Sequence, residues 1–178
     1  MNRKSLILAL FIFLLAFFIR VLYSYTFPGF IDHGDSVGYI DIGKNIASAR
    51  SPLAALINPY RTPAYPVFLA LNETFFHTVS SVPLMQYAIA SIAIATFFLT
   101  LTRKKIPRTL SCIISLFILL SINVFGWEKS LMTEGLATSW LLFLISLSLL
   151  LFDSLSLSLL VSFIILSAFG FLLRPMVI

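Results

Sequence analysis

The chain has 178 residues, of which 60% are hydrophobic and 11% are charged, and its mean hydropathy is +1.03. This balance excludes a soluble globular protein, because too few polar side chains are present to cover its surface. The net charge of +5 sits in a few clusters and gives little reason to expect a nucleic-acid partner, and the single cysteine, Cys112, excludes an intrachain disulfide.

Apolar runs near the length of a membrane-spanning helix, about 20 residues, recur along the chain. The first covers 6–27, follows Arg3 and Lys4, and lacks a convincing small-residue cleavage site, which indicates an uncleaved anchor with a cytoplasmic N-terminus. Four further spans are predicted at 83–102, 109–126, 135–152 and 154–173. We therefore predict an all-α protein, a polytopic transmembrane bundle of about five spans.

The segment 63–80 is ambiguous, because it is short for a span and is interrupted by polar residues such as Asn72 and Glu73. The basic cluster at 103–108 decides its placement, since positively charged loops prefer the cytoplasm. That cluster lies inside only if 63–80 remains at the outer interface. We therefore predict an external loop over 28–82 that contains interfacial helices, and most other charged residues on the same external face.

Apolar residues recur at approximately helical spacing over 35–47, which predicts an amphipathic helix in the membrane interface. Asp35 and Ser36 stand at its start, where either side chain can accept hydrogen bonds from free backbone N–H groups. On local chemistry alone, a helix cap and a functional carboxylate both remain open for Asp35.

The stretch from Asn58 to Pro66 contains Pro63, which suits the first turn of a helix. Arg61 then lies just before a helix N-terminus, where its guanidinium and the free N–H groups favour an anion such as phosphate. An interfacial arginine in contact with lipid headgroups is the alternative.

Three other charged residues lie near the predicted outer ends of spans. Glu134 precedes the span over 135–152 and acidic residues at such positions usually cap the helix. Arg20 lies inside the first span, and snorkelling to the external interface is the favoured interpretation. Arg174 is either an interfacial anchor or a second phosphate ligand.

These motifs follow one another in a distinctive order. The first span is followed by the motif Asp35-Ser36-x-x-Tyr39 and by the pair Asn45-x-Ala47. Residues 60–70 then read Tyr-Arg-Thr-Pro-Ala-Tyr-Pro-Val-Phe-Leu-Ala. Residues 133–138 read Thr-Glu-Gly-Leu-Ala-Thr, and residues 173–175 read Leu-Arg-Pro. In this order they resemble the N-terminal part of the C-type (GT-C) membrane glycosyltransferases, which include the family 39-like protein mannosyltransferases and the lipid A aminoarabinose transferases. Gly43 departs from the resemblance, because the family commonly has Ala there.

The resemblance implies transfer of a sugar from a polyprenyl-phosphate carrier to an acceptor on the outer face of the plasma or inner membrane. It implies that Asp35 is the catalytic carboxylate and Glu134 the second acidic residue. The residues expected to bind the substrate share cationic or aromatic side chains within these motifs: Arg61, Tyr39, Tyr60, Tyr65 and Arg174. A divalent metal ion could share the chemistry, but only Asp35 and Glu134 are evident ligands, so metal dependence is left open.

Members of the family have further spans and often a soluble C-terminal domain, so we expect the 178 residues to be a fragment without transferase activity of its own. A non-catalytic membrane protein is the alternative, either a degenerate relative that binds lipid carriers or an assembly subunit. A transporter is less favoured, because the spans lack midplane charges and the sequence has no internal repeat. The identities of the sugar and the acceptor do not follow from this sequence.

Overall fold

The computed structural model describes residues 2–29, 34–48 and 61–173, and its regular elements in these ranges are all helical. The all-α prediction is therefore confirmed for these ranges. In chain order the helices are α1 (Arg3–Thr26), α2 (Ser36–Ala47), α4 (Ala64–Phe76), the 3-10 helix η1 (Val79–Ser81), α5 (Val82–Arg103), α6 (Arg108–Leu119), α7 (Ile122–Lys129), α8 (Thr133–Leu151) and α9 (Leu157–Leu173).

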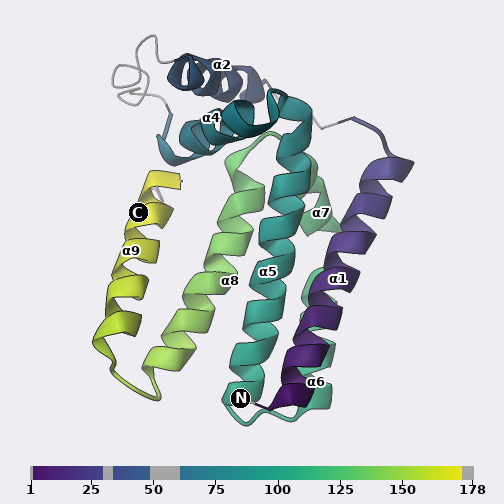
Figure 1. Cartoon of the computed structure of the whole chain (residues 1–178), viewed down its shortest axis with the longest axis vertical. Helices are drawn as coiled ribbons and strands as arrows, with labels where there is room; N and C mark the ends of the chain where they lie inside the picture. The colour runs from purple at the N-terminus through teal and green to yellow at the C-terminus, as the bar shows by residue number, and fades with distance from the viewer. Residues whose placement is uncertain (1, 30–33, 49–60, 174–178) are drawn as a thin grey trace.

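The long helices form a bundle that carries two shorter helices across one end. Figure 1 shows α1, α5, α8 and α9 running along the long axis of the molecule, with α2 and α4 lying across the end opposite the N-terminus. Helix α5 is central, since it packs against α1, α6, α7 and α8. The bundle end covered by α2 and α4 is called the capped end below, and the end with the N-terminus is called the basic end.

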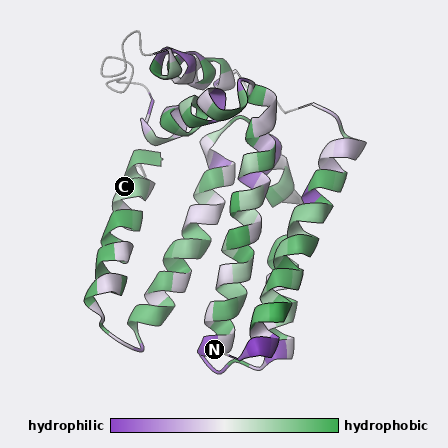
Figure 2. Cartoon of the chain, viewed as in Figure 1, coloured by the Kyte–Doolittle hydropathy of each residue, from purple (hydrophilic) through white to green (hydrophobic). Residues whose placement is uncertain are grey.

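Three helical segments are long and apolar enough to cross a membrane: α1, the segment Val79–Arg103 that contains α5, and α8. Helices α6 and α9 are apolar but shorter, with 12 and 17 residues. In Figure 2 the middle of the long helices is mostly hydrophobic, and the hydrophilic residues gather near the two ends of the bundle. These features are those of a membrane protein with several spanning helices, whereas the count of five spans stays a prediction.

The predicted span over 109–126 is divided into two helices. Helix α6 ends at Leu119, Ser121 has an extended backbone, and α7 begins at Ile122. The carbonyl of Ser121 accepts hydrogen bonds from the N–H groups of Val124 and Phe125, so a new helix starts there instead of continuing the old one. Together α6 and α7 carry the chain back along the bundle to the start of α8 (Figure 1).

The ambiguous segment 63–80 forms α4, which has 13 residues. A helix of this length extends about 20 Å, less than the hydrocarbon thickness of a bilayer. It ends at His77, which adopts a left-handed conformation with φ of 54° and turns the chain toward α5. Helix α4 packs against α2 at the capped end, and its place at the outer membrane interface stays a prediction.

Two apolar clusters hold these helices together. The bundle cluster joins α1, α5 and α6 through buried Ala9, Ile12, Ala16, Ile94, Phe98 and Leu119. The capped-end cluster joins α2 and α4 to α5, α8 and α9 through Tyr39, Ala64, Tyr65, Leu69, Val82, Leu131, Leu136 and Leu173. Alanines in the bundle cluster allow the helix backbones to approach closely, which favours helix association in lipid. The capped-end cluster fixes α2 and α4 on the bundle.

Gly170 marks the closest approach of α9 to α8. A Cβ atom at Gly170 would overlap the indole of Trp140, which is held by a 2.6 Å hydrogen bond from its Nε1 to the Leu166 carbonyl. We therefore expect Gly170→Ala to lower the free energy of unfolding by about 1–3 kcal/mol, as overpacking does elsewhere. Thermal unfolding in detergent measures this loss.

Gly126→Ala is the matched control for Gly170→Ala. A Cβ atom at Gly126 meets nothing within 4 Å, and alanine is the better helix former, so we expect no loss of stability. Equal melting temperatures for the two variants would contradict the tight contact between α8 and α9.

Candidate functional site

Asp35 and Arg61 form an ion pair at the capped end. The Arg61 Nη2 atom donates to Asp35 Oδ1 at 2.5 Å. Asp35 occupies the N-cap position of α2, but its side chain makes no capping hydrogen bond, so the helix-cap interpretation of this carboxylate is wrong. Because Arg61 lies just before α4, as the sequence predicts, the ion pair joins the starts of α2 and α4.

The Arg61 guanidinium is supported on a second side by an aromatic ring. Its Cζ atom lies 4.9 Å from the centroid of the Tyr39 ring, a cation–π distance. The hydrogen bond to Asp35 raises the pKa of Arg61 above its ordinary value, so the guanidinium remains a cation. The side chains of Arg61 and Asp35 are 26% and 56% exposed. An exposed pair of this kind contributes at most about 1 kcal/mol to stability, so an incoming anion can replace the carboxylate at little cost.

Tyr65 supports Tyr39 from inside the protein. The two rings meet edge to face with centroids 5.2 Å apart, and the Tyr65 side chain is fully buried. Burial raises the pKa of Tyr65 well above its ordinary range, and the charge of Glu134 raises it further, so the phenol stays neutral. Its hydroxyl donates to Gln86 Oε1 at 3.5 Å. Tyr65 therefore positions Tyr39, and its predicted contact with substrate is not direct in this conformation.

Glu134 lies in the first turn of α8. Its charge acts on buried Tyr65, and the neighbouring Leu131 and Leu136 belong to the capped-end cluster. The hydroxyl of Thr133 donates to Glu134 Oε2 at 3.2 Å. The structure thus brings Glu134 to the same end as the Asp35–Arg61 pair. A carboxylate is also favourable in the first turn of any helix, so a purely structural role stays open.

Two of the predicted substrate ligands, Tyr60 and Arg174, lie outside the described residues. Next to them in the sequence, Thr62 Oγ1 donates to the Leu173 carbonyl at 2.8 Å. This bond attaches the turn that carries Arg61 to the end of α9.

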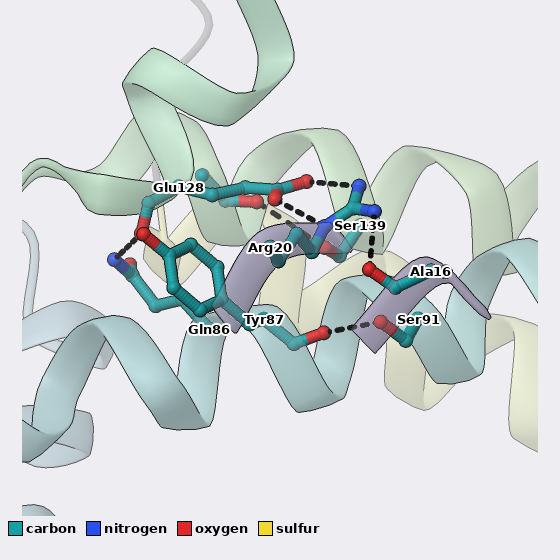
Figure 3. Close-up of polar contacts among 8 residues, drawn as sticks. Ala16, Arg20, Gln86, Tyr87, Ser91, Glu128 and Ser139 are labelled. Carbon is teal, nitrogen blue, oxygen red and sulfur yellow. Dashed lines mark hydrogen bonds and ion pairs between the residues drawn. The ribbon is translucent and has the colours of Figure 1, made fainter. Parts of the chain in front are cut away.

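A buried ion pair below this site is not predicted by any of the sequence motifs. Arg20 Nε donates to Glu128 Oε2 at 2.5 Å and Arg20 Nη2 donates to Glu128 Oε1 at 2.9 Å. Figure 3 shows the guanidinium between this carboxylate and the carbonyl of Ala16, which accepts at 3.2 Å. Arg20 and Glu128 are 0% and 1% exposed. The snorkelling interpretation of Arg20 is therefore wrong, because its guanidinium is paired inside the bundle.

Gln86 connects the buried pair to the capped end. Its Nε2 atom donates to the backbone carbonyls of Glu128 and Ser130 at 2.7 and 2.9 Å, and Figure 3 shows Gln86 beside Glu128. The Oε1 atom of Gln86 accepts from the Tyr65 hydroxyl. Lys129 is also buried and donates to the carbonyl of Phe27, although the sequence places it on the external face. The turn that leads to Glu134 is therefore attached to both α1 and α5.

The described ranges contain no group of three or more His, Cys, Asp or Glu side chains that could hold a metal ion. Asp35 and Glu134 remain the two carboxylates that could contribute oxygen atoms to a metal site, and no step below is assigned to a metal. Metal dependence stays a prediction.

In comparisons with known proteins, the chain matches no protein-family model, no curated protein and no solved structure. The resemblance to C-type glycosyltransferases therefore rests on the ordered motifs alone.

Proposed function

We propose that the chain is a module of a C-type membrane glycosyltransferase, which transfers a sugar from a polyprenyl-phosphate donor to an acceptor outside the membrane. The exposed Arg61 guanidinium, held by Asp35 at 2.5 Å and by the ring of Tyr39, is the observation that carries the proposal. It supplies an available cation next to a carboxylate, as the transfer of a sugar from a phosphate requires. The order of the sequence motifs supplies the reaction class.

The proposed topology has five crossings. Helices α1, α5 and α8 form three of them, the broken pair α6–α7 forms another, and α9 forms the last. The basic residues at the N-terminus and at 103–108 lie at the same end of the bundle, which the positive-inside rule assigns to the cytoplasm. The capped end, with Asp35 and Arg61, is then external, at the plasma or inner membrane.

The proposed reaction begins when the carrier phosphate replaces the Asp35 carboxylate on Arg61. The freed carboxylate accepts the proton of the acceptor hydroxyl, whose oxygen forms a bond to the anomeric carbon of the sugar. The bond from that carbon to the phosphate oxygen breaks, and Arg61 stabilises the negative charge that develops on the departing lipid phosphate. The Glu134 carboxylate, near Tyr65, is assigned to the acceptor side as the second acidic group.

Binding of the carrier tests this proposal directly. We expect Arg61→Gln to weaken the binding of a polyprenyl phosphate by about 10- to 100-fold, since a hydrogen bond between charged groups contributes about 1.5–3 kcal/mol. Native mass spectrometry of the chain in nanodiscs measures the binding. Lys44→Gln removes an exposed cation from α2 and is the matched control, for which we expect little change. Two results would contradict a phosphate site at Arg61. One is an equal loss of polyprenyl phosphate binding in Arg61→Gln and Lys44→Gln. The other is that Arg61→Gln weakens the binding of the uncharged polyprenol as much as that of the polyprenyl phosphate.

A further inference from the structure

A cavity of about 590 Å³ lies at the basic end of the bundle. It is formed by the start of α1, at Asn2 and Ser5, and by the turn between α5 and α6, which includes Arg103 and Arg108. Its volume is within the range of small-molecule sites in proteins. It is separate from the Asp35–Arg61 pair, because it lies at the other end of the long helices.

The cavity contains two cations that have no acidic partner. Arg103 and Arg108 are both exposed, and neither forms an ion pair or hydrogen bond through its side chain with any residue that the structure describes. The acidic residue at this end, Asp153, is 2.5 Å from Lys104, which does not line the cavity. Within 2–29, 34–48 and 61–173, no carboxylate neutralises the positive charge of the two arginines that line the cavity.

Free backbone N–H groups lie beside the cavity at the start of α6. Helix α6 begins at Arg108 after Pro107, and no side chain caps it, so its first N–H groups lack partners within the helix. The last carbonyls of α5 already accept: those of Thr100, Leu101 and Thr102 receive N–H groups of the following turn at 3.0–3.2 Å. Both the arginines and the backbone therefore favour an anion.

The cavity is also close to the apolar surface of the bundle. Directly beyond Ser5, the side chains of Leu6 and Ile7 are 44% and 59% exposed, and on α6 Leu110 and Ile113 are 47% and 57% exposed. These side chains can cover the acyl chains of a lipid whose phosphate lies between the arginines. A free phosphate ion would gain nothing from them. Basic pockets between spanning helices are a known form of lipid headgroup site.

We propose that this cavity binds the headgroup phosphate of an anionic phospholipid in the membrane leaflet at the basic end. The lipid joins the start of α1 to the turn between α5 and α6, two parts of the chain that lie about 100 residues apart. The proposal does not depend on the proposed transferase function. In the topology given above, the leaflet is the cytoplasmic one.

Phosphatidylglycerol binding to the full chain in detergent tests the proposal, with native mass spectrometry as the measurement. We expect Arg103→Gln/Arg108→Gln to weaken binding by about 30-fold, which corresponds to about 2 kcal/mol. The matched control, Lys4→Gln/Lys105→Gln, removes the same charge from the same end without changing the cavity lining, and we expect less than about a threefold loss. Arg103→Lys/Arg108→Lys keeps the charge and should retain most of the binding, and circular dichroism checks that each variant is folded.

Phosphatidylcholine and inorganic phosphate distinguish a lipid site from general attraction. We expect wild-type protein to bind phosphatidylcholine more weakly than phosphatidylglycerol, and millimolar inorganic phosphate not to displace the lipid. Equal losses in the cavity variant and the lysine control would overturn the proposal. So would equal affinity for the two lipids, or displacement of the lipid by inorganic phosphate, which would identify the cavity as a site for free anions.

Discussion

Replacing Glu128 with glutamine is expected to lower the free energy of unfolding by about 3–5 kcal/mol, the cost of removing one partner from a buried ion pair. The variant leaves Arg20 fully buried, with the Ala16 carbonyl and a neutral amide in place of a carboxylate. The Arg20 guanidinium also lies 4.8 Å from the ring centroid of Phe125, a cation–π contact that the variant retains. Unfolding in mixed detergents, followed by circular dichroism, measures the loss.

Two further variants distinguish the loss of the buried ion pair from the loss of a carboxylate in general. Glu73→Gln removes a carboxylate from α4, where no ion pair with a described residue holds it, and should change stability by less than about 0.5 kcal/mol. Arg20→Met/Glu128→Leu removes both charges together and should be more stable than Glu128→Gln, because no charge is left unpaired. The single variants Arg20→Met and Glu128→Leu complete the cycle: if their separate losses of stability add up to the loss in the double variant, the two charges are not coupled.

Gln86 connects the backbone beside the buried pair to the capped end. Gln86 donates to the carbonyl of Glu128 and accepts from Tyr65, and Tyr65 supports the ring of Tyr39 that lies against Arg61. A displacement of α7 therefore changes the support of the guanidinium at the capped end. We infer that the buried polar network serves to position the turn 130–133 and the residues beneath the exposed ion pair.

Local sequence patterns predict much of this fold, because helix formation depends on local spacing. The amphipathic pattern over 35–47 predicts α2, and Pro63 predicts the start of α4. The break between α6 and α7 has a weaker local signal, the polar residues Ser121 and Asn123 within an apolar run. Length and composition alone favour a single helix there, so the prediction over 109–126 does not show the break.

Contacts between distant residues are harder to predict. Arg20 and Glu128 are 108 positions apart, and each alone has an ordinary explanation at a membrane interface. One signal is present: the predicted topology places Arg20 near the outer end of the first span and Glu128 in the external segment just after the span over 109–126, so the two opposite charges lie toward the same face. To predict this pair from sequence, one must know that α7 lies near α1. That position of α7 depends on the break in the helix after Leu119.

Gly43 lies at a close contact between α2 and α4. A Cβ atom at this position would lie 2.8 Å from Leu69 Cβ and 3.3 Å from the Pro66 carbonyl oxygen. Helices α2 and α4 are thus packed too closely for an alanine at position 43. This close packing brings the Asp35 and Arg61 ends of the two helices together.

Asp35→Asn separates catalysis from carrier binding. We expect it to slow sugar transfer by about 100- to 10,000-fold, the usual contribution of a general base. Binding of the polyprenyl phosphate should be equal to wild type or stronger, because the change removes a negative charge 2.5 Å from the Arg61 guanidinium. Transfer is measured in membranes of the source organism that carry the variant, and binding is measured on the purified chain. Asp41→Asn, on an exposed position of the same helix, is the matched control for both assays.

The combination of the two measurements decides between the candidate functions. Full transfer by Asp35→Asn would remove this carboxylate from the mechanism. Weaker binding of the carrier to Asp35→Asn would show that Asp35 mainly holds Arg61 in place, because the neutral asparagine cannot form the charged contact that Asp35 makes with Arg61 at 2.5 Å. If the carrier binds through Arg61 but wild-type membranes transfer no sugar, the non-catalytic carrier-binding alternative is favoured. The proposed transferase requires the remaining outcome, in which the replacement of one carboxylate oxygen by an amide nitrogen slows transfer strongly while the phosphate still binds to Arg61.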